Sequence, residues 1–174
     1  SIGNVNNSYT NTLIEVDAIN DEVSIGGLIG LCIDNRGSEP TIQNSYSNGN
    51  IIVRTVNMPL YLGGLIGQST VMNPSLNQAR MKTILKNSFS AINMNVDIQG
   101  VSDSYIGGII GKGFSIQINN TYAFGRINTE NLSEAGSAGG IIGLIANNYV
   151  YISGTYWCTE TMGLSSSGIN NSTG

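Results

Sequence analysis

The sequence predicts an all-β protein, a parallel right-handed β-solenoid (β-helix) of about five coils with roughly 35 residues each. Two observations predict this fold. Two short phrases alternate in a fixed order along the 174 residues, and they recur at a period of roughly 32–44 residues, which is typical of stacked repeats. The strand-like runs between the turn residues are too short and too rich in β-branched residues for amphipathic helices.

The first phrase is Gly-Gly-aliphatic-aliphatic-Gly, and it occurs at Gly26–Gly30, Gly63–Gly67, Gly107–Gly111 and Gly139–Gly143. The second phrase carries Asn-Ser, or a close variant, before an aromatic residue, and it ends at Tyr9, Tyr46, Phe89, Tyr122 and Tyr156. We therefore expect a single repeat array over residues 1–174, with units near 1–38, 39–81, 82–114, 115–148 and 149–174. A β-sandwich is the alternative fold, but its strands would not need a repeating motif.

The first strand of each unit should surround the Asn-Ser-aromatic phrase. Side chains alternate between the two faces of a strand, so counting every second residue puts an apolar residue, an asparagine and an aromatic residue on one face. We expect that face to point inward and Ser or Thr to point outward. Stacked amides can pair from coil to coil, which predicts a buried asparagine ladder of Asn7, Asn44, Asn87 and Asn120.

A second, aliphatic run follows at Leu13–Val16, Ile51–Val53, Ile92–Ile98 and Ile127–Thr129. Gly49 and Gly125 precede two of these runs, where we expect a corner with positive φ. The glycine phrase forms the third run, and its repetition indicates that backbone passes close to backbone there.

Three segments should project from the coils, at Gln68–Thr83, Asp34–Thr41 and Asn128–Ala138. A short helix within Pro74–Lys86 is the one helical alternative.

The composition bounds the class of protein. Hydrophobic residues make up 40% and charged residues only 10% of the chain, which is enough apolar material for a core but little charge to keep surfaces apart. The net charge of −4 argues against a nucleic-acid partner. No apolar run is long enough to span a membrane and no signal peptide opens the chain, so we interpret it as a segment of a longer protein.

The glycine phrase together with Asn-Ser-Tyr-Ser-x-Gly resembles the GLUG repeat of large secreted and surface-anchored microbial proteins. The stretch Thr155–Gly163, followed by Ser165–Gly168, is similar to the Tyr-Trp-Asp-x-Glu-Thr-Ser-Gly end of such arrays. Cys158 stands where that pattern carries Asp, and Met162 where it carries Ser. The resemblance covers Val5 to about Gly168, and it implies a noncatalytic segment located outside the cell or on its surface.

Catalytic chemistry has little support in the sequence. There is no His, which removes the commonest general base and most zinc sites. Candidate carboxylates for sugar chemistry are Glu15, Asp17, Asp21, Glu22, Asp97 and Asp103. Glu15 and Asp17 alternate with Val16 and Ala18 as a solvent-facing side would, and no Asp recurs with the period as a calcium-binding solenoid requires. We expect no enzymatic activity, no metal and no cofactor.

Cys32 and Cys158 lie about four rungs apart, near 19 Å at roughly 4.8 Å per rung, so an internal disulfide is not expected. Two readings remain open, a pair of free buried thiols or a disulfide between Cys32 of one copy and Cys158 of the next. Five Asn-x-Ser/Thr sequons are candidate glycosylation sites, at Asn6, Asn119, Asn131, Asn170 and Asn171.

These observations favour an extracellular structural or adhesive repeat module, a stalk, spacer or filament-forming subunit. Its partners would be other copies or neighbouring repeats, and a glycan or host surface. The first alternative is a carbohydrate-binding module that stacks sugars on Tyr61, Tyr149, Tyr151 or Trp157. The second is a polysaccharide-degrading enzyme that uses Asp17 and Asp21.

Overall fold

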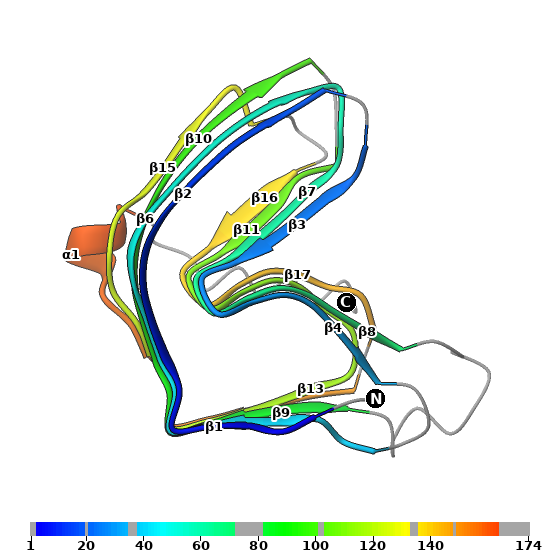
Figure 1. The fold of residues 1–174 in the computed structure, drawn as a ribbon, viewed down its shortest axis with the longest axis vertical. Helices are drawn as coiled ribbons and strands as arrows, with labels where there is room; N and C mark the ends of the chain where they lie inside the picture. The colour runs from blue at the N-terminus through cyan, green and yellow to red at the C-terminus, as the bar shows by residue number, and fades with distance from the viewer. Residues whose placement is uncertain are drawn as a thin grey trace.

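The chain folds into a parallel β-solenoid, as the repeats predict. A computed structural model describes residues 3–19, 21–34, 38–71, 82–100, 103–132, 136–147 and 149–163. Figure 1 looks along the stack of coils, which lie one behind another from the blue N-terminal coil to the orange C-terminal one. Strands of successive coils pair in parallel and in register, and Figure 1 shows that the section of each coil has two lobes.

Strands at equivalent positions in successive coils pair with one another and form four sheets in the described part of the chain. Sheet A holds β1 (Val5–Asn6), β5 (Thr41–Gln43), β9 (Thr83–Lys86), β13 (Ile116–Asn119) and β18 (Val150–Ser153). Sheet B holds β2 (Tyr9–Ala18), β6 (Tyr46–Val56), β10 (Phe89–Gln99), β14 (Tyr122–Ala123) and β19 (Tyr156–Trp157), and β15 (Ile127–Glu130) also pairs with β10. Sheet C holds β3 (Val23–Gly26), β7 (Leu60–Gly63), β11 (Tyr105–Gly107) and β16 (Ser137–Gly139). Sheet D holds β4 (Ile29–Asp34), β8 (Ile66–Val71), β12 (Ile110–Gly113) and β17 (Ile142–Ile145).

The glycine phrase contains a turn between two strands, so the expected single run is wrong. In the second coil, β7 ends at Gly63 and β8 begins at Ile66. Figure 1 shows this turn as the inward-pointing vertex between sheets C and D, which faces the inner side of sheet B. The section is therefore indented, and each of the first three coils has four strands where three runs were expected.

Backbone passes close to backbone at this turn, as predicted from the glycines. A Cβ on Gly63 would overlap the carbonyl oxygen of Ile66, and a Cβ on Gly64 would overlap that of Gly108 in the next coil. A Cβ on Gly67 would lie only 2.6 Å from the carbonyl oxygen of Gly30. Only a residue without a Cβ fits at these positions.

Hydroxyl groups on the inner face of sheet B hold the vertex in place. Thr10 Oγ1 donates to the Gly27 carbonyl oxygen at 2.6 Å, and Ser47 Oγ donates to the Gly64 carbonyl oxygen at 2.5 Å. The buried turn carbonyls are thus satisfied by the residue that follows the aromatic of the other phrase. The two phrases alternate in the sequence because each completes the other in space.

The asparagine ladder exists, but it lies on the surface. Asn44 Nδ2 donates to Asn7 Oδ1 at 3.2 Å, Asn87 Nδ2 to Asn44 Oδ1 at 3.4 Å, and Asn120 Nδ2 to Asn87 Oδ1 at 3.3 Å. All four residues are exposed. Their φ angles of 50°, 51°, 50° and 48° belong to the left-handed region, which Asn adopts more readily than most residues.

The left-handed asparagine turns the chain from sheet A into sheet B and shifts the alternation of side chains by one residue. Ile42 before it and Ser45 after it are therefore buried, while Tyr46 points outward. The expectation that Asn and aromatic residues face inward and Ser outward is wrong for this reason. The buried Ser45 Oγ donates to the Gln43 carbonyl oxygen at 2.8 Å and is satisfied.

The core is built from equivalent aliphatic positions that lie over one another. On sheet A, Ile42, Leu85 and Ile118 are at most 1% exposed and pair in register. The inner faces of the other sheets contribute further buried aliphatics in the same way, for example Ile51, Val53, Leu65, Ile66, Ile109 and Ile110.

Gly49 and Gly125 have φ of 126° and 124°, which confirms the prediction of positive φ, although Gly49 lies within β6. The expected insertion at Gln68–Thr83 is shorter, since Gln68–Val71 belongs to β8 and Thr83 begins β9. Thr83–Lys86 forms a strand, so that part of the helical alternative is wrong. Residues 72–81 lie outside the described residues, as do 35–37 and 133–135 of the other two loops.

The C-terminal end carries a single described helix, α1 (Thr159–Met162), with Gly163 in the left-handed region. Met162 is 1% exposed, and its Cε lies beside Gly108. Trp157 takes the place that Ala123 has in the preceding coil, and its ring covers Gly140. The last described coil is thus partly covered by the Tyr-Trp-Cys segment and this helix.

Candidate functional site

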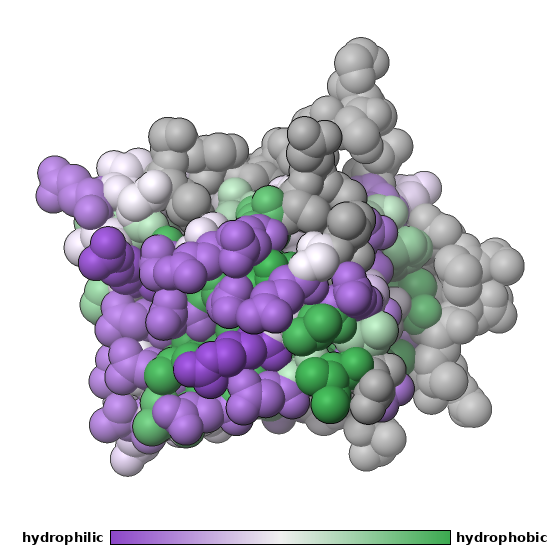
Figure 2. Space-filling view, turned by 90° about the horizontal axis from the view of Figure 1, so that it is seen from above, coloured by the Kyte–Doolittle hydropathy of each residue, from purple (hydrophilic) through white to green (hydrophobic). Residues whose placement is uncertain are grey.

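The outer face of sheet B is a regular surface of the described part of the chain. Its three long strands β2, β6 and β10 pair in register, so that residues at equivalent positions lie side by side and form rows along the solenoid axis. Figure 2, which looks onto the upper edge of Figure 1, shows hydrophilic side chains over most of the visible face with hydrophobic ones between them.

An aromatic row runs along this face beside the asparagine ladder. The rings of Tyr9 and Tyr46, Tyr46 and Phe89, and Phe89 and Tyr122 stack with centroids 5.2, 4.7 and 5.1 Å apart and interplanar angles of 13°, 3° and 9°. Each inner ring is covered on both faces by its neighbours, so it presents its edge to solvent. Stacking of this kind stabilises the contact between coils, but it leaves no free face on the inner rings, Tyr46 and Phe89, on which a sugar could stack.

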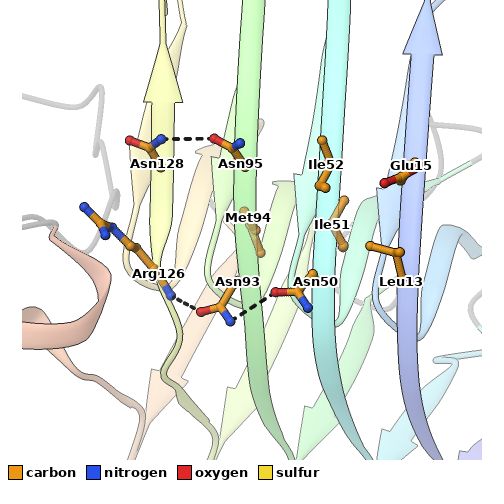
Figure 3. Close-up of a pocket in the computed structure, with 10 residues that line it drawn as sticks. All are labelled: Leu13, Glu15, Asn50, Ile51, Ile52, Asn93, Met94, Asn95, Arg126 and Asn128. Carbon is orange, nitrogen blue, oxygen red and sulfur yellow. Dashed lines mark hydrogen bonds between the residues drawn. The ribbon is translucent and has the colours of Figure 1, made fainter.

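A shallow groove of about 610 Å³ lies farther along the same strands (Figure 3). It has an apolar part, formed by Leu13 and Ile52, and a part lined by the side-chain amides of four asparagines, Asn50, Asn93, Asn95 and Asn128. Leu13 is 60% exposed, so the apolar part of the groove is accessible from solvent.

Hydrogen bonds fix the amides of the groove. Asn93 Nδ2 donates to Asn50 Oδ1 at 3.2 Å, and Asn93 Oδ1 accepts from the backbone N–H of Arg126 at 3.0 Å. Asn128 Nδ2 donates to Asn95 Oδ1 at 3.0 Å. Both pairs join adjacent strands, as the dashed lines in Figure 3 show. The groove therefore presents preoriented donors and acceptors.

The candidate carboxylates lie in different surroundings. Glu15 and Asp17 lie on the solvent-facing side of β2, as predicted, and Asp17 makes an exposed ion pair with Arg54 at 3.3 Å. Asp97 accepts hydrogen bonds from Gln99 and Asn131. Asp21 and Asp103 are exposed. The described carboxylates thus show solvated or structural contacts.

Glu22 belongs to a polar network between sheets C and D. Tyr61 Oη donates to Glu22 Oε2 at 3.2 Å, and Lys112 Nζ donates to Tyr61 Oη at 3.2 Å while lying 4.3 Å from the centre of its ring. Tyr61 also stacks on Tyr105 at 6.0 Å. Burial, and then the Glu22 carboxylate, raises the pKa of Tyr61 to about 12.

The four proposed stacking residues have different surroundings. Tyr61 is 5% exposed and is held by the network just described, so it offers no platform. Trp157 packs against the core, with its ring over Gly140. Tyr149 and Tyr151 are exposed and line a hollow of about 280 Å³ with Lys82 and Gln117, so the stacking prediction remains for these two.

Both cysteines are free thiols. Cys32 is 8% exposed, its Sγ lies 3.6 Å from Thr83 Oγ1, and burial raises its pKa. Hydrogen bonds with Thr161 lower the pKa of Cys158, which is half-buried. A disulfide between copies stays a prediction, and the burial of Cys32 weighs against it, since its sulfur would have to reach the surface.

Among the sequons, Asn6 and Asn131 are exposed and Asn119 is half-buried, while Asn170 and Asn171 lie outside the described residues. Glycosylation stays a prediction at all five. No cluster of three or more potential metal ligands occurs in the ranges that the structure describes. In those same ranges no helix is long and apolar enough to cross a membrane.

Comparison with family models, with curated proteins and with solved structures finds no match. The fold alone defines the class of the protein, a parallel β-solenoid. The resemblance to the GLUG repeat stays a prediction.

The groove was not found from the sequence. Its residues lie between the two phrases, where no motif draws attention to them. Counting four residues on from Tyr9, Tyr46 and Phe89 aligns Leu13, Asn50 and Asn93, but the wrong inside–outside assignment at the asparagine hid the fact that this row faces solvent.

Proposed function

We propose that this chain is a noncatalytic structural repeat module, a stalk, spacer or filament-forming subunit that associates end to end with other coils of its kind. The observation that carries the proposal is the open N-terminal end of the solenoid. All four sheets end there in a strand of the first coil, namely β1, β2, β3 and β4, whose outer backbone edges have no partner among the described residues. Such edges are templates for further pairing.

The core is also uncovered at that end. Val16 is half-buried, whereas Val53 and Val96, its equivalents in the next coils, are 0% and 1% exposed. Leu28 and Ile29 are half-buried, whereas Leu65 and Ile66 are fully buried. Covering this apolar section with another coil would recover the burial that every internal coil already has.

The axial ladders support the same role. The asparagine and aromatic rows join the first four coils, and at the open end Asn7 and Tyr9 each have a row neighbour on one side only. Tyr9 is 67% exposed as a result. A coil added at this end would extend both rows.

The noncatalytic part of the proposal is supported by the sequence, which has no His, and by the candidate carboxylates, of which Asp17, Glu22 and Asp97 are held in structural contacts. The location outside the cell or on its surface rests on the GLUG resemblance. Immunodetection of the parent protein on intact cells tests that location.

Sedimentation velocity and negative-stain electron microscopy of the purified chain over a range of concentrations test the association. We expect elongated species whose size grows with concentration. The variant Val16→Lys places a charge in the open section and should remain monomeric. Glu15→Lys, which puts the same side chain on the outer face of the same strand, should associate as the wild type does.

The two variants are compared only if their far-ultraviolet circular dichroism matches that of the wild type. Compact monomers of the wild-type chain at high concentration would contradict the proposed association. Equal loss of association in both variants would show that the open section is not the contact.

A further inference from the structure

We propose that the groove on the outer face of sheet B is a binding site for a neutral, linear oligosaccharide. This goes beyond the structural role, because the groove lies on the side of the solenoid and not at its open end. The argument rests on the shape of the groove, on its division into apolar and amide parts, and on the charges around it.

The groove runs across the strands and therefore along the solenoid axis. Apart from Arg126, which directly precedes β15, its lining residues come from β2, β6, β10 and β15, four neighbouring strands in the described part of sheet B. Three steps of about 4.8 Å between strands give a length of roughly 14 Å. This suits an extended chain of a few sugar units better than a compact small molecule.

The lining complements the two kinds of group on a sugar ring, the apolar C–H groups and the hydroxyls. Leu13 and Ile52 form an apolar surface for the C–H groups of the ring. On the other side, Asn50 and Asn95 use their amide oxygens in the ladder, and neither Nδ2 donates a hydrogen bond elsewhere in the described residues. These two groups are free to donate to sugar hydroxyls, and Asn128 Oδ1 is free to accept from one.

The amides are also held in place before any ligand arrives. Asn93 bridges Asn50 and the backbone N–H of Arg126, and Asn95 is held by Asn128. Fixed side chains lose less rotational freedom on binding than mobile ones do, so the hydrogen bonds that they make to a ligand contribute more to affinity.

The charges favour a neutral ligand. In the described residues the outer face of sheet B carries four carboxylates and two guanidinium groups, those of Glu15, Asp17, Asp97, Glu130, Arg54 and Arg126. Arg54 is already paired with Asp17. The groove itself is lined by one charge of each sign, Glu15 and Arg126, so the excess of negative charge lies along the face around it. The net negative charge along this face would repel an acidic polysaccharide, whereas it would not repel a neutral one.

Isothermal titration calorimetry tests the site with cellohexaose, xylohexaose and mannohexaose as neutral probes and hexagalacturonate as the acidic comparison. We expect saturable binding of at least one neutral probe and weaker binding, or none, of the acidic one. Asn95→Ala and Asn50→Ala should each weaken binding about three- to tenfold, the effect of one lost hydrogen bond.

Asn48→Ala is the matched control. Asn48 Nδ2 donates to Asn11 Oδ1 at 3.2 Å, so the variant breaks an exposed ladder bond of the same kind on the same sheet, outside the groove. Its affinity should equal that of the wild type. Circular dichroism and urea unfolding of each variant establish that the fold is kept.

Three outcomes would overturn the proposal: no binding of any neutral probe, equal binding of hexagalacturonate, or equal weakening by Asn48→Ala and Asn95→Ala. Sedimentation of the same variants keeps this result separate from the structural role. A wild-type chain that associates but binds no neutral probe would contradict only the groove, and one that binds a neutral probe but stays monomeric would contradict only the end-to-end contact.

Discussion

Replacement of Asn87 by Ala and by Gly measures why asparagine occupies the corner between sheets A and B. Asn87 has φ of 50° and makes two ladder hydrogen bonds of 3.4 and 3.3 Å with Asn44 and Asn120. The bonds are long and exposed, so each should contribute about 0.5 kcal/mol, and both variants lose about 1 kcal/mol from this cause.

The two variants differ in the cost of the backbone conformation. Alanine in the left-handed region costs about 1–2 kcal/mol, whereas glycine adopts it freely but adds about 0.5–1 kcal/mol of unfolded-state entropy. We therefore expect Asn87→Ala to lower the free energy of unfolding by about 2–3 kcal/mol, and Asn87→Gly to lower it by about 1 kcal/mol less than that.

Urea unfolding monitored by circular dichroism gives the free energies of unfolding of both variants, which can be compared when their m-values are equal. Asn93 is the control, because it also makes two bonds, of 3.2 and 3.0 Å, but its φ is not positive. There the order should reverse, with glycine worse than alanine. If Asn87→Gly is as destabilising as Asn87→Ala, the left-handed φ is not the reason for asparagine at this corner.

Three further predictions follow from the turn, the thiols and the buried tyrosine. Gly64→Ala should lower the free energy of unfolding by more than 4 kcal/mol or prevent folding, because its Cβ would overlap the Gly108 carbonyl oxygen, whereas Gly3→Ala, with open space around it, should melt as the wild type does. Ellman's reagent should react with the Cys158 thiol, whose pKa is lowered, in the folded protein, and with the buried Cys32 only in urea. Equal labelling of both thiols in the native state would contradict the burial of Cys32. Folding raises the pKa of Tyr61 from 10.0 to about 12, so its contribution to the free energy of unfolding is complete below pH 10 and falls as the pH rises toward 12. Tyr61→Phe should therefore lose less stability than the wild type between pH 10 and 12. An unchanged dependence of stability on pH would count against the shift.

The stacking of equivalent positions could be predicted from the sequence because the repeats impose it. Once a phrase recurs in a parallel solenoid, its members must lie over one another. The alignment of Asn7 with Asn44 and the close approach at Gly63 and Gly64 therefore followed from spacing alone.

The inside and outside of the first strand could not be assigned by counting, because the rule of alternation holds only while φ stays extended. At Asn44 the chain leaves the extended region, and every residue after it changes face. One signal was present: the fifth phrase has Gly154 in the asparagine position, with φ of 58°. Exchange of Asn for Gly is typical of a left-handed residue.

The corners of the solenoid differ in what they tolerate. Between sheets A and B the described connection has two residues in every coil, from Asn6 to Tyr9 as from Lys86 to Phe89. Between sheets D and A it has two residues from Gly113 to Ile116 but eleven from Val71 to Thr83. Added length at this edge leaves the pairing of the flanking strands intact, since β8 and β9 keep their register with β12 and β13. New sequence could therefore be grafted there while the frame that carries it stays the same, which makes this edge the natural place for related arrays to diverge.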